Sequence, residues 1–388
     1  MYRSSYSLPR RQFLSILAGA PGASALLRSA FSPDVGIPDK PVIPTPRCFL
    51  INGKPKFLVS GSIHYFRVPN ELWRDRLLKA KRAGLNCIET YIAWNFHEPE
   101  EGTYLFEQDC DIEEFFRICR ELGLYSFVRT GPYIDSEWDS GGYPAWLIGK
   151  PGSEFRTMNS VTIHFIRLWF KQLIPRIARN QVTRGGPIIL VQSENEYLFC
   201  ERPGSSEYLR FLMKTLRELG VEVPITDCNG LQNPLPSSLK TINASGPGTI
   251  VSQYRKLYPN TPPFLSEFWI GPSVQFWDQP LVSRTAHEVQ QDTMAALAQR
   301  AMYNFYMFHG GTNFGFWAGN SVHSNHSWIT TRYDFSAPVA EGGALNAKYF
   351  AVKNTNLLAI NFQDFLCHAA PTPIPVEILG PVCVRALQ

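Results

Sequence analysis

The chain of 388 residues is poor in charged side chains, and its small net charge comes from one end. Asp, Glu, Lys and Arg make up 18% of the residues, against roughly 25% in an average soluble protein. The formal net charge is +4, but residues 1–30 hold four arginines and no acid, so the remainder sums to zero. A neutral body lacks the basic face that binds nucleic acid or anionic membranes, and we exclude both partners.

The motifs that mark several other enzyme classes are also missing. No two of the eight cysteines have the close spacing of a zinc site or a redox motif. No glycine-rich dinucleotide fingerprint follows the first predicted strand, and no G-x-S-x-G elbow of a serine hydrolase follows any strand. A metalloenzyme is disfavoured because no metal-ligand spacing on one helix links the available histidines, His64, His97, His309, His323 and His326. The sequence therefore implies no metal and no cofactor.

The first 47 residues are expected to lie outside the folded domain. Arg10 and Arg11 form a twin-arginine pair before the apolar run 13–27, which is shorter than the about 20 residues of a membrane span. Residues 1–30 are therefore predicted to be an export signal rather than a disordered basic tail, which places the protein in the periplasm or outside the cell. No other segment is apolar enough to cross a bilayer. Five prolines in 31–47 predict an extended linker.

Export permits disulfides, so the cysteines need a separate prediction. Cys200 and Cys228 form the one candidate pair, because both follow strand ends that are rich in motif residues. The other six are expected to be buried free thiols.

From residue 48 onward, short apolar runs alternate with helical patterns. Helices are expected from about Asn70, after Asp111, whose spacing to Glu114 resembles a capping box, and over 160–180, 205–219 and 284–302. Eight strands are predicted, at 57–63, 86–91, 125–130, 188–192, 224–227, 241–244, 264–267 and 304–308. Eight such units favour a (β/α)8 TIM barrel over 48–360 rather than a doubly wound open sheet. Residues 361–388 are expected to be a tail or the remnant of a β-domain.

Acidic and other polar residues follow these strands abruptly. In a barrel the C-terminal strand ends meet at one face, which is where active sites lie. Glu194 and Glu196 come directly after one apolar strand, and Glu267 ends another. A single Glu is more often a salt-bridge partner, but two acids at matching strand ends favour a catalytic pair. Two carboxyls about 5–5.5 Å apart permit glycoside hydrolysis with retention of configuration.

Six segments carry a resemblance to a known family over about 48–350. They are SGSIHYFRVP (60–69), TYIAWNFHEPEEGTY (90–104), GPYIDSEWDSGGYPAWL (131–147), GGPIILVQSENEY (185–197), SEFW (266–269) and FYMFHGGTNFG (305–315). Together they resemble the β-galactosidases of glycoside hydrolase family 35. The resemblance implies a retaining exo-glycosidase that hydrolyses terminal non-reducing β-D-galactose. It also implies a chain that lacks most of the C-terminal β-domains usual in the family.

The same resemblance implies roles for individual residues. Glu196 corresponds to the acid/base, Glu267 to the nucleophile, and Asn195 to a contact with the sugar 2-hydroxyl. Glu194 becomes a supporting residue, and Tyr306 is expected to face Glu267. The substrate-binding positions are Tyr91, Asp135, Ser136, Glu137, Asn195, Tyr306 and Tyr333. These roles need one carboxyl protonated and the other ionised, so the two environments must differ.

The sequence departs from the family pattern at three places. Asp135 and Ser136 replace the usual Cys or Asn followed by Ala, Pro272 stands where a Trp is common, and Phe335 replaces a Tyr. None of these changes removes a catalytic acid, but all bear on which sugar is preferred. The alternatives are therefore a related exo-β-glycosidase, for example for β-glucosaminides, and a carbohydrate-binding barrel without turnover.

Overall fold

The structure is a computed structural model that describes residues 41–200, 205–232, 235–271, 283–321, 327–334 and 336–368. All of these residues belong to one compact unit of the chain. The predicted export signal, residues 31–40 of the predicted linker, Pro272 and Phe335 lie outside the described residues.

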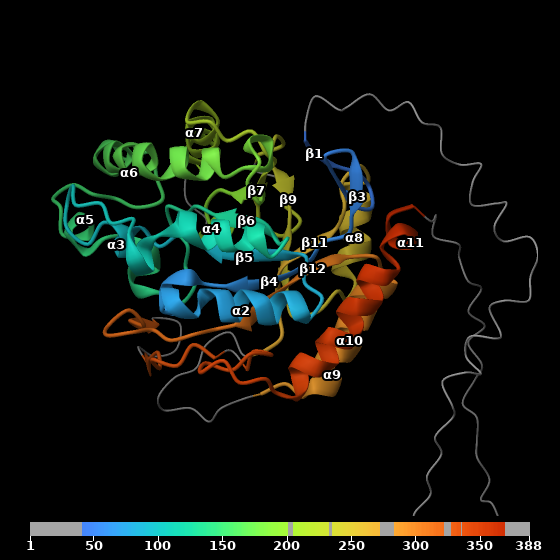
Figure 1. Cartoon of the computed structure of the whole chain (residues 1–388). Helices are drawn as coiled ribbons and strands as arrows, with labels where there is room; N and C mark the ends of the chain where they lie inside the picture. The colour runs from blue at the N-terminus through green and yellow to red at the C-terminus, as the bar shows by residue number, and fades with distance from the viewer. Residues whose placement is uncertain are drawn as a thin grey trace, which may run out of the picture. The chain divides into compact units, whose positions relative to one another are not determined.

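A parallel β-barrel forms the centre of this unit (Figure 1). The hydrogen-bonded order is β10-β11-β12-β4-β5-β6-β7-β8-β9, and every neighbouring pair is parallel. The strands are β4 (Val59–Ile63), β5 (Cys87–Tyr91), β6 (Tyr125–Arg129), β7 (Ile188–Gln192), β8 (Ile225–Asp227), β9 (Leu239–Lys240), β10 (Ile242–Ala244), β11 (Phe264–Trp269) and β12 (Met302–His309).

Thr241 explains how nine strands make a barrel of eight positions. It alone separates β9, which pairs with β8, from β10, which pairs with β11. Its backbone N–H donates to the carbonyl of Asp227 at 2.9 Å, so the stretch stays on its neighbour through the break. The two short strands therefore act as one and close the sheet, which confirms the predicted (β/α)8 barrel.

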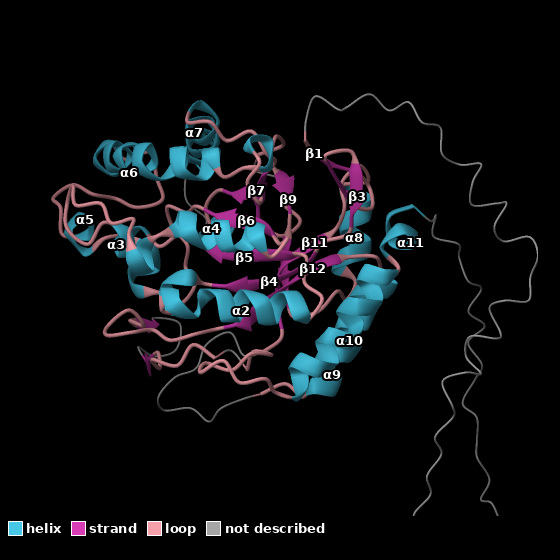
Figure 2. Ribbon diagram, in the orientation of Figure 1, coloured by secondary structure: helices cyan, strands magenta, loops and turns pink. Residues whose placement is uncertain are grey.

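The longer helices cover the outside of the barrel (Figure 2). Asp111 caps α4 as expected, because its side chain accepts from the Glu114 N–H at 2.9 Å. Thr285 and Glu288 form a capping box at the start of α9. The helices are α2 (Asn70–Arg82), α3 (Trp94–His97), α4 (Ile112–Glu121), α5 (Ala145–Ile148), α6 (Ser160–Arg179), α7 (Ser205–Glu218), α8 (Ile250–Leu257), α9 (Ala286–Ala298), α10 (Ala347–Asn361) and α11 (Gln363–His368).

The barrel strands bury polar as well as apolar side chains. Asn304 of β12 accepts from the Ser60 hydroxyl at 2.7 Å and donates to the Ser62 oxygen at 2.8 Å. Glu89 and Arg129 are also fully buried, on β5 and β6. Because buried polar groups are costly unless they are paired, these side chains constrain how the strands align.

Two domain boundaries differ from those predicted from the sequence, namely the end of the linker and the end of the barrel. Within the predicted linker, β1 (Val42–Pro44) pairs antiparallel with β2 (Phe49–Ile51), which also pairs with β3 (Lys54–Lys56). The linker therefore ends before Val42. At the other end α10 continues past residue 360, and α11 contacts β3. A two-stranded ribbon, β13 (Asn320–Ser321) with β14 (Ser327–Trp328), completes the strands.

Cys228 is a buried free thiol, so the predicted disulfide with Cys200 is wrong. The expectation of buried free thiols is confirmed for Cys48, Cys87, Cys110, Cys119 and Cys367. Through the described residues, we find no helix with the length and apolar character of a membrane span.

Candidate active site

Both predicted catalytic acids lie at the C-terminal ends of barrel strands. Glu267 lies within β11, in register with Asn243 of β10. Glu196 follows β7 by four residues, and its carboxylate accepts a hydrogen bond from Asn243 Nδ2 at 2.9 Å. Asn243 therefore links the strand of one acid to the side chain of the other, and the fold brings together residues 71 positions apart in the sequence.

Glu267 is buried among hydrogen-bond donors. Its Oε1 accepts from the Tyr91 hydroxyl at 2.7 Å and from Arg129 Nη1, and its Oε2 accepts from Trp269 Nε1 at 3.0 Å. Donors converge on both oxygens, and the guanidinium that donates to Oε1 favours the charged form of the carboxyl. Glu267 is therefore held as an oriented carboxylate.

Glu196 lies in the opposite kind of environment. Burial and the negative charge of Glu267 raise the pKa of Glu196 to about 7, against the lowering effect of the Asn243 hydrogen bond. Asp135 adds to the rise and Arg129 opposes it. Near neutral pH this carboxyl can hold a proton while its neighbour is charged, which is the division of roles that acid–base catalysis beside a nucleophile needs.

A small network positions Asn195 and the backbone of Glu196. The Asn195 Oδ1 lies 3.0 Å from the Tyr91 hydroxyl and 3.4 Å from the Cys228 sulfur. The same sulfur accepts from the Glu196 N–H and from Gln192 Nε2, both at 3.3 Å. Cys228 therefore supports the turn that presents both predicted site residues.

Glu194 has a structural partner, in agreement with its predicted supporting role. Its carboxylate forms a two-pronged ion pair with Arg156, with contacts of 2.8 and 3.2 Å. It also accepts from the backbone N–H of Asn195 at 2.9 Å. Glu194 and Glu196 both have left-handed backbone, with φ of 62° and 47°. The chain thus turns sharply after β7 and points the two acids at different surroundings.

The loop Asp135–Glu137 has three consecutive left-handed residues, with φ of 52°, 58° and 45°. Non-glycine residues adopt this conformation only where the surroundings enforce it. Arg67 supplies the restraint, since its Nη1 donates to the Ser136 hydroxyl at 2.9 Å and its Nη2 donates to the Ser136 carbonyl. The guanidinium is fixed in turn by Asn313, at 2.7 Å from its Nε.

Glu137 is joined to the two predicted site tyrosines. The Tyr333 hydroxyl donates to Glu137 Oε2 and lies 2.8 Å from the Tyr306 hydroxyl. Burial and the charge of Asp135 raise the pKa of Glu137. The Tyr333 ring stacks on the Arg67 guanidinium, 3.6 Å from its centroid. Burial raises the pKa of Tyr306, and the charges of Glu137 and Glu267 raise it further, so this tyrosine lies in the electrostatic field of both carboxyls.

Sequence reasoning missed several residues of this site. Arg129, Asn243, Trp269 and Cys228 each contact a predicted site residue directly. Arg129 had a detectable signal, because an arginine inside an apolar strand must find an anionic partner when it is buried. Trp269 closes the SEFW segment, whereas Asn243 and Cys228 carry no signal beyond their place at a strand end.

Other strand-end residues do not join the site. Asp227 pairs with Lys240 and Ser238. His309 accepts from Arg76 Nε at 3.3 Å and contacts the Val339 carbonyl. In the parts of the chain described here, no three His, Cys, Asp or Glu side chains are grouped so as to hold a metal ion.

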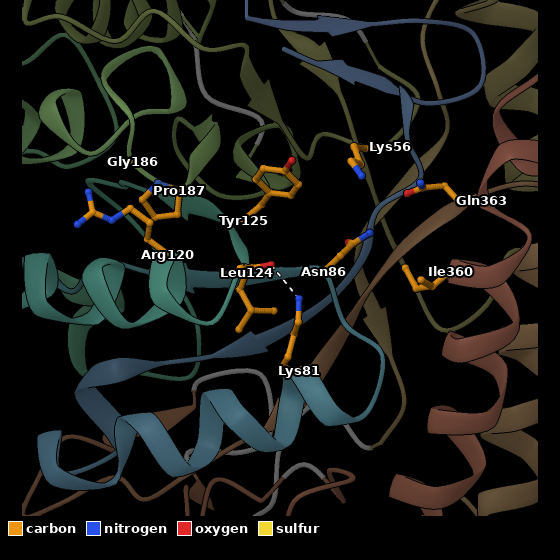
Figure 3. Close-up of a pocket in the computed structure, with 11 residues that line it drawn as sticks. Lys56, Lys81, Asn86, Arg120, Leu124, Tyr125, Gly186, Pro187, Ile360 and Gln363 are labelled. Atoms are coloured by element: carbon orange, nitrogen blue, oxygen red, sulfur yellow. Dashed lines mark hydrogen bonds between the residues drawn. The ribbon is translucent and has the colours of Figure 1, made fainter. Parts of the chain in front are cut away.

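A pocket of about 380 Å³ lies at the opposite end of the barrel (Figure 3). Asn86, Tyr125 and Pro187, which line it, precede or begin β5, β6 and β7. Its cationic groups are Lys56, Lys81 and Arg120. Because the acids lie at the C-terminal strand ends, this pocket is separate from them.

A (β/α)8 barrel with two carboxyls in contrasting environments at its C-terminal face defines the chain as a glycosidase-type barrel. Solved structures agree on the fold alone. A GH5_18 protein from Streptomyces cattleya has a TM-score of 0.58 and 10% identity, covering 82% of this chain and 83% of its own. A β-galactosidase from Marinomonas ef1 has a TM-score of 0.57 and 12% identity, covering 80% of this chain and 61% of its own.

The chain belongs to glycosyl hydrolases family 35, whose sequence model matches residues 48–358. β-Galactosidases of Homo sapiens and Macaca fascicularis are each 41% identical to it, over 353 and 319 residues. These alignments cover 88% and 79% of this chain but 51% and 46% of the relatives. The chain therefore spans about half the length of the curated relatives it matches.

Proposed function

We propose that this chain is the catalytic barrel of a retaining exo-β-galactosidase, which removes terminal non-reducing β-D-galactose by double displacement. The observation that carries the proposal is the contrast between Glu267, surrounded by donors, and Glu196, whose pKa is raised to about 7 beside it. The β-galactosidases among the relatives support galactose as the sugar.

In the first step a Glu267 oxygen forms a bond to the anomeric carbon. The bond from that carbon to the leaving oxygen breaks, and this oxygen takes the proton of Glu196. In the second step Glu196, now a carboxylate, removes a proton from water. The water oxygen bonds to the anomeric carbon, Glu267 leaves as a carboxylate, and the starting protonation states return.

The other residues hold the sugar and the nucleophile. Tyr91 and Arg129 fix Glu267. In this proposal Asn195 binds the 2-hydroxyl, which its contacts with Tyr91 and Cys228 support by orienting the amide. Asp135, Ser136, Glu137, Tyr306 and Tyr333 supply the remaining galactose contacts. The raised pKa of Glu137 suits a group that donates to or accepts from a sugar hydroxyl.

The test is hydrolysis of nitrophenyl β-galactoside, β-glucoside, β-glucosaminide and β-fucoside by the purified full chain. We expect preference for the galactoside, and a loss of about a hundredfold to ten-thousandfold in Glu196→Gln and at least as much in Glu267→Gln. Azide separates the roles of the two acids. It rescues a variant of either acid, but the product of the nucleophile variant and that of the acid/base variant have different configurations. Glu98→Gln is the matched control, since Glu98 is a buried carboxyl bonded to Trp94.

Each other outcome has a definite meaning. Preference for another sugar retains the mechanism and moves specificity to Asp135, Ser136 and Phe335. A folded, monodisperse protein that hydrolyses nothing in the panel is a carbohydrate-binding barrel, and the galactosidase proposal is then withdrawn.

We also propose export through residues 1–30, on the basis of the Arg10-Arg11 pair. Replacing both arginines with lysine is expected to leave the precursor in the cytoplasmic fraction, whereas unchanged fractionation contradicts the proposal.

A further inference from the structure

A third carboxyl lies behind the catalytic pair. Glu89, on β5, is fully buried in the barrel and takes none of the roles described above. Its Oε1 is 3.7 Å from Nε of Arg129, whose Nη1 donates to Glu267. Arg129 thus stands between two carboxyls, one hydrogen-bonded to it and one held further away.

The atoms that face each other between Glu89 and Arg129 are unsatisfied. Among the described residues, no group makes a hydrogen bond of standard geometry to either oxygen of Glu89, although Ser62 and Asn304 lie close enough to act on its pKa. Nε and Nη2 of Arg129 likewise have no hydrogen-bond partner there. A charge-assisted hydrogen bond measures about 2.7–2.9 Å, so the pair stands just beyond bonding distance. Two acceptors and two donors are therefore poised to form a bidentate ion pair after a small movement.

The groups around Glu89 explain why it does not form a hydrogen bond with Arg129. Burial raises the pKa of Glu89 to about 7, Arg129 lowers it, and the charge of Glu267 raises it further. The polar side chains that face it from β4 and β12, Ser62 and Asn304, lower it. With Glu267 charged, Arg129 already has its anion, and Glu89 can remain protonated near neutral pH.

We propose that Glu89 is a positioning residue that becomes the counter-ion of Arg129 when Glu267 is esterified by the sugar. The inference rests on the proposed double displacement. When Glu267 bonds to the anomeric carbon it loses its negative charge and leaves Arg129 as a buried cation. Glu89 then releases its proton to water and pairs with Nε and Nη2 of Arg129. Hydrolysis of the ester restores the charge of Glu267, and Glu89 takes a proton back.

The direction follows from linkage. The charge of Glu267 is one cause of the raised pKa of Glu89, so loss of that charge lowers the pKa. An intermediate that binds fewer protons than the free enzyme becomes more favourable as pH rises. Formation of the sugar ester is therefore coupled to Glu89, and the coupling disappears if residue 89 cannot ionise.

The test uses a 2-deoxy-2-fluoro-β-galactoside with a dinitrophenolate leaving group, which departs without a proton. It therefore labels Glu267 even in the Glu196→Gln variant, where the acid/base no longer titrates. We compare this variant with Glu196→Gln/Glu89→Gln, and count protons with an indicator dye in weak buffer at pH 6.5. Glu196→Gln/Glu98→Gln is the matched control, because Glu98 is buried but bonded to Trp94.

We expect the Glu196→Gln variant to release up to about one proton more per adduct than the Glu89 double variant. The labelling rate of the Glu196→Gln variant should also rise as pH approaches 7. This rise should exceed that of the Glu89 double variant by up to about tenfold, which is the factor for one unit of pKa. Because Glu137 also feels the charge of Glu267, the difference between variants is the decisive quantity. Equal proton release by the two variants overturns the inference.

Two further measurements keep the test decisive. If the Glu89 variant does not fold, Glu196→Gln/Glu137→Gln must still release protons on labelling, and a count of zero overturns the inference. If mass spectrometry finds no adduct on Glu267 of the wild-type protein, the proposed function fails and the inference fails with it. If Glu267 is labelled but no proton is released, the inference about Glu89 fails while the proposed function stands.

Discussion

At the scale of single residues, the protonation of Glu196 depends on its burial and on two residues from other strands. The charge of Glu267 on β11 raises its pKa, and the amide of Asn243 on β10 lowers it. The resulting pKa of about 7 means that the proton needed by the leaving oxygen is lost as pH rises through neutrality. Activity toward substrates with poor leaving groups should therefore fall on the alkaline side.

Asn243→Ala tests this balance. Removing a donor from the charged carboxylate should raise the pKa of Glu196, so the alkaline limb of kcat/KM moves to higher pH. We expect kcat/KM at its optimum to fall about threefold to tenfold, as for one lost hydrogen bond. The profile is measured with a methyl or nitrophenyl galactoside. A dinitrophenyl galactoside is the control, because its departure needs no proton. A limb that moves to lower pH contradicts the assignment.

Cys228 gives a second prediction at this scale. Cys228→Ala removes the acceptor for the Glu196 N–H and the contact with Asn195. We expect kcat to fall by about tenfold with little change in KM, and Cys228→Ser to retain most activity. Cys119→Ala is the control, since Cys119 is an equally buried thiol on α4. Steady-state kinetics check the prediction, and an equal loss in both alanine variants would reduce Cys228 to a packing residue.

At the scale of elements, strained turns after the strands place the site. Five non-glycine residues of the site, at positions 135, 136, 137, 194 and 196, have left-handed backbone. Each such residue costs about 1–3 kcal/mol. Arg67, at the end of the short helix that follows β4, restrains the first loop, and Arg156, between α5 and α6, restrains the second. Buried arginines from neighbouring segments thus hold turns that would not persist by themselves.

Gly310, directly after β12, shows how close these elements approach. A Cβ there would lie 1.4 Å from the Tyr333 carbonyl oxygen, so any side chain must displace the segment that carries the Tyr333 hydroxyl. We expect Gly310→Ala to raise KM and lower kcat/KM by about a hundredfold, as for a misplacement of about 1 Å. Gly342→Ala is the matched control, because its Cβ would meet nothing within 4 Å. Comparable kinetics in the two variants would show that Tyr333 does not need this placement.

At the scale of the whole molecule, the site works against stability. Burial raises the pKa values of Glu89 and Glu196, each to about 7 from an ordinary 4.5. A carboxyl with a raised pKa binds more protons folded than unfolded, so its contribution to stability falls as pH rises from about 4.5 to 7. The proposed acid/base, Glu196, is thus destabilising near neutral pH.

Glu196→Gln should therefore be more stable than the wild-type chain at pH 7.5. The expected gain is on the order of 1–3 kcal/mol, and it should disappear near pH 4.5, where the wild-type carboxyl is protonated in both states. Thermal unfolding at several pH values measures it. Glu114→Gln should show no such gain, because hydrogen bonds from Arg117 lower the pKa of the Glu114 carboxyl. A constant difference across pH would contradict the prediction.

The sequence by itself determined the barrel and the positions of its acids. Apolar runs predicted β7 at 188–192 without error, and Asp111 predicted the start of α4. These signals are readable because strand periodicity and capping act over a few neighbouring residues. Glu196 and Glu267 were predicted at strand ends because parallel strands send those ends to one face.

Only the tertiary structure decided what surrounds the acids. Arg129 on Glu267, Asn243 on Glu196 and a free Cys228 beneath the turn join segments that are distant in sequence. Cys228 looked like a disulfide partner because residue type alone does not reveal what a side chain contacts. The raised pKa of Glu196 likewise depends on burial and on the charge of Glu267, which come together only once the barrel has closed.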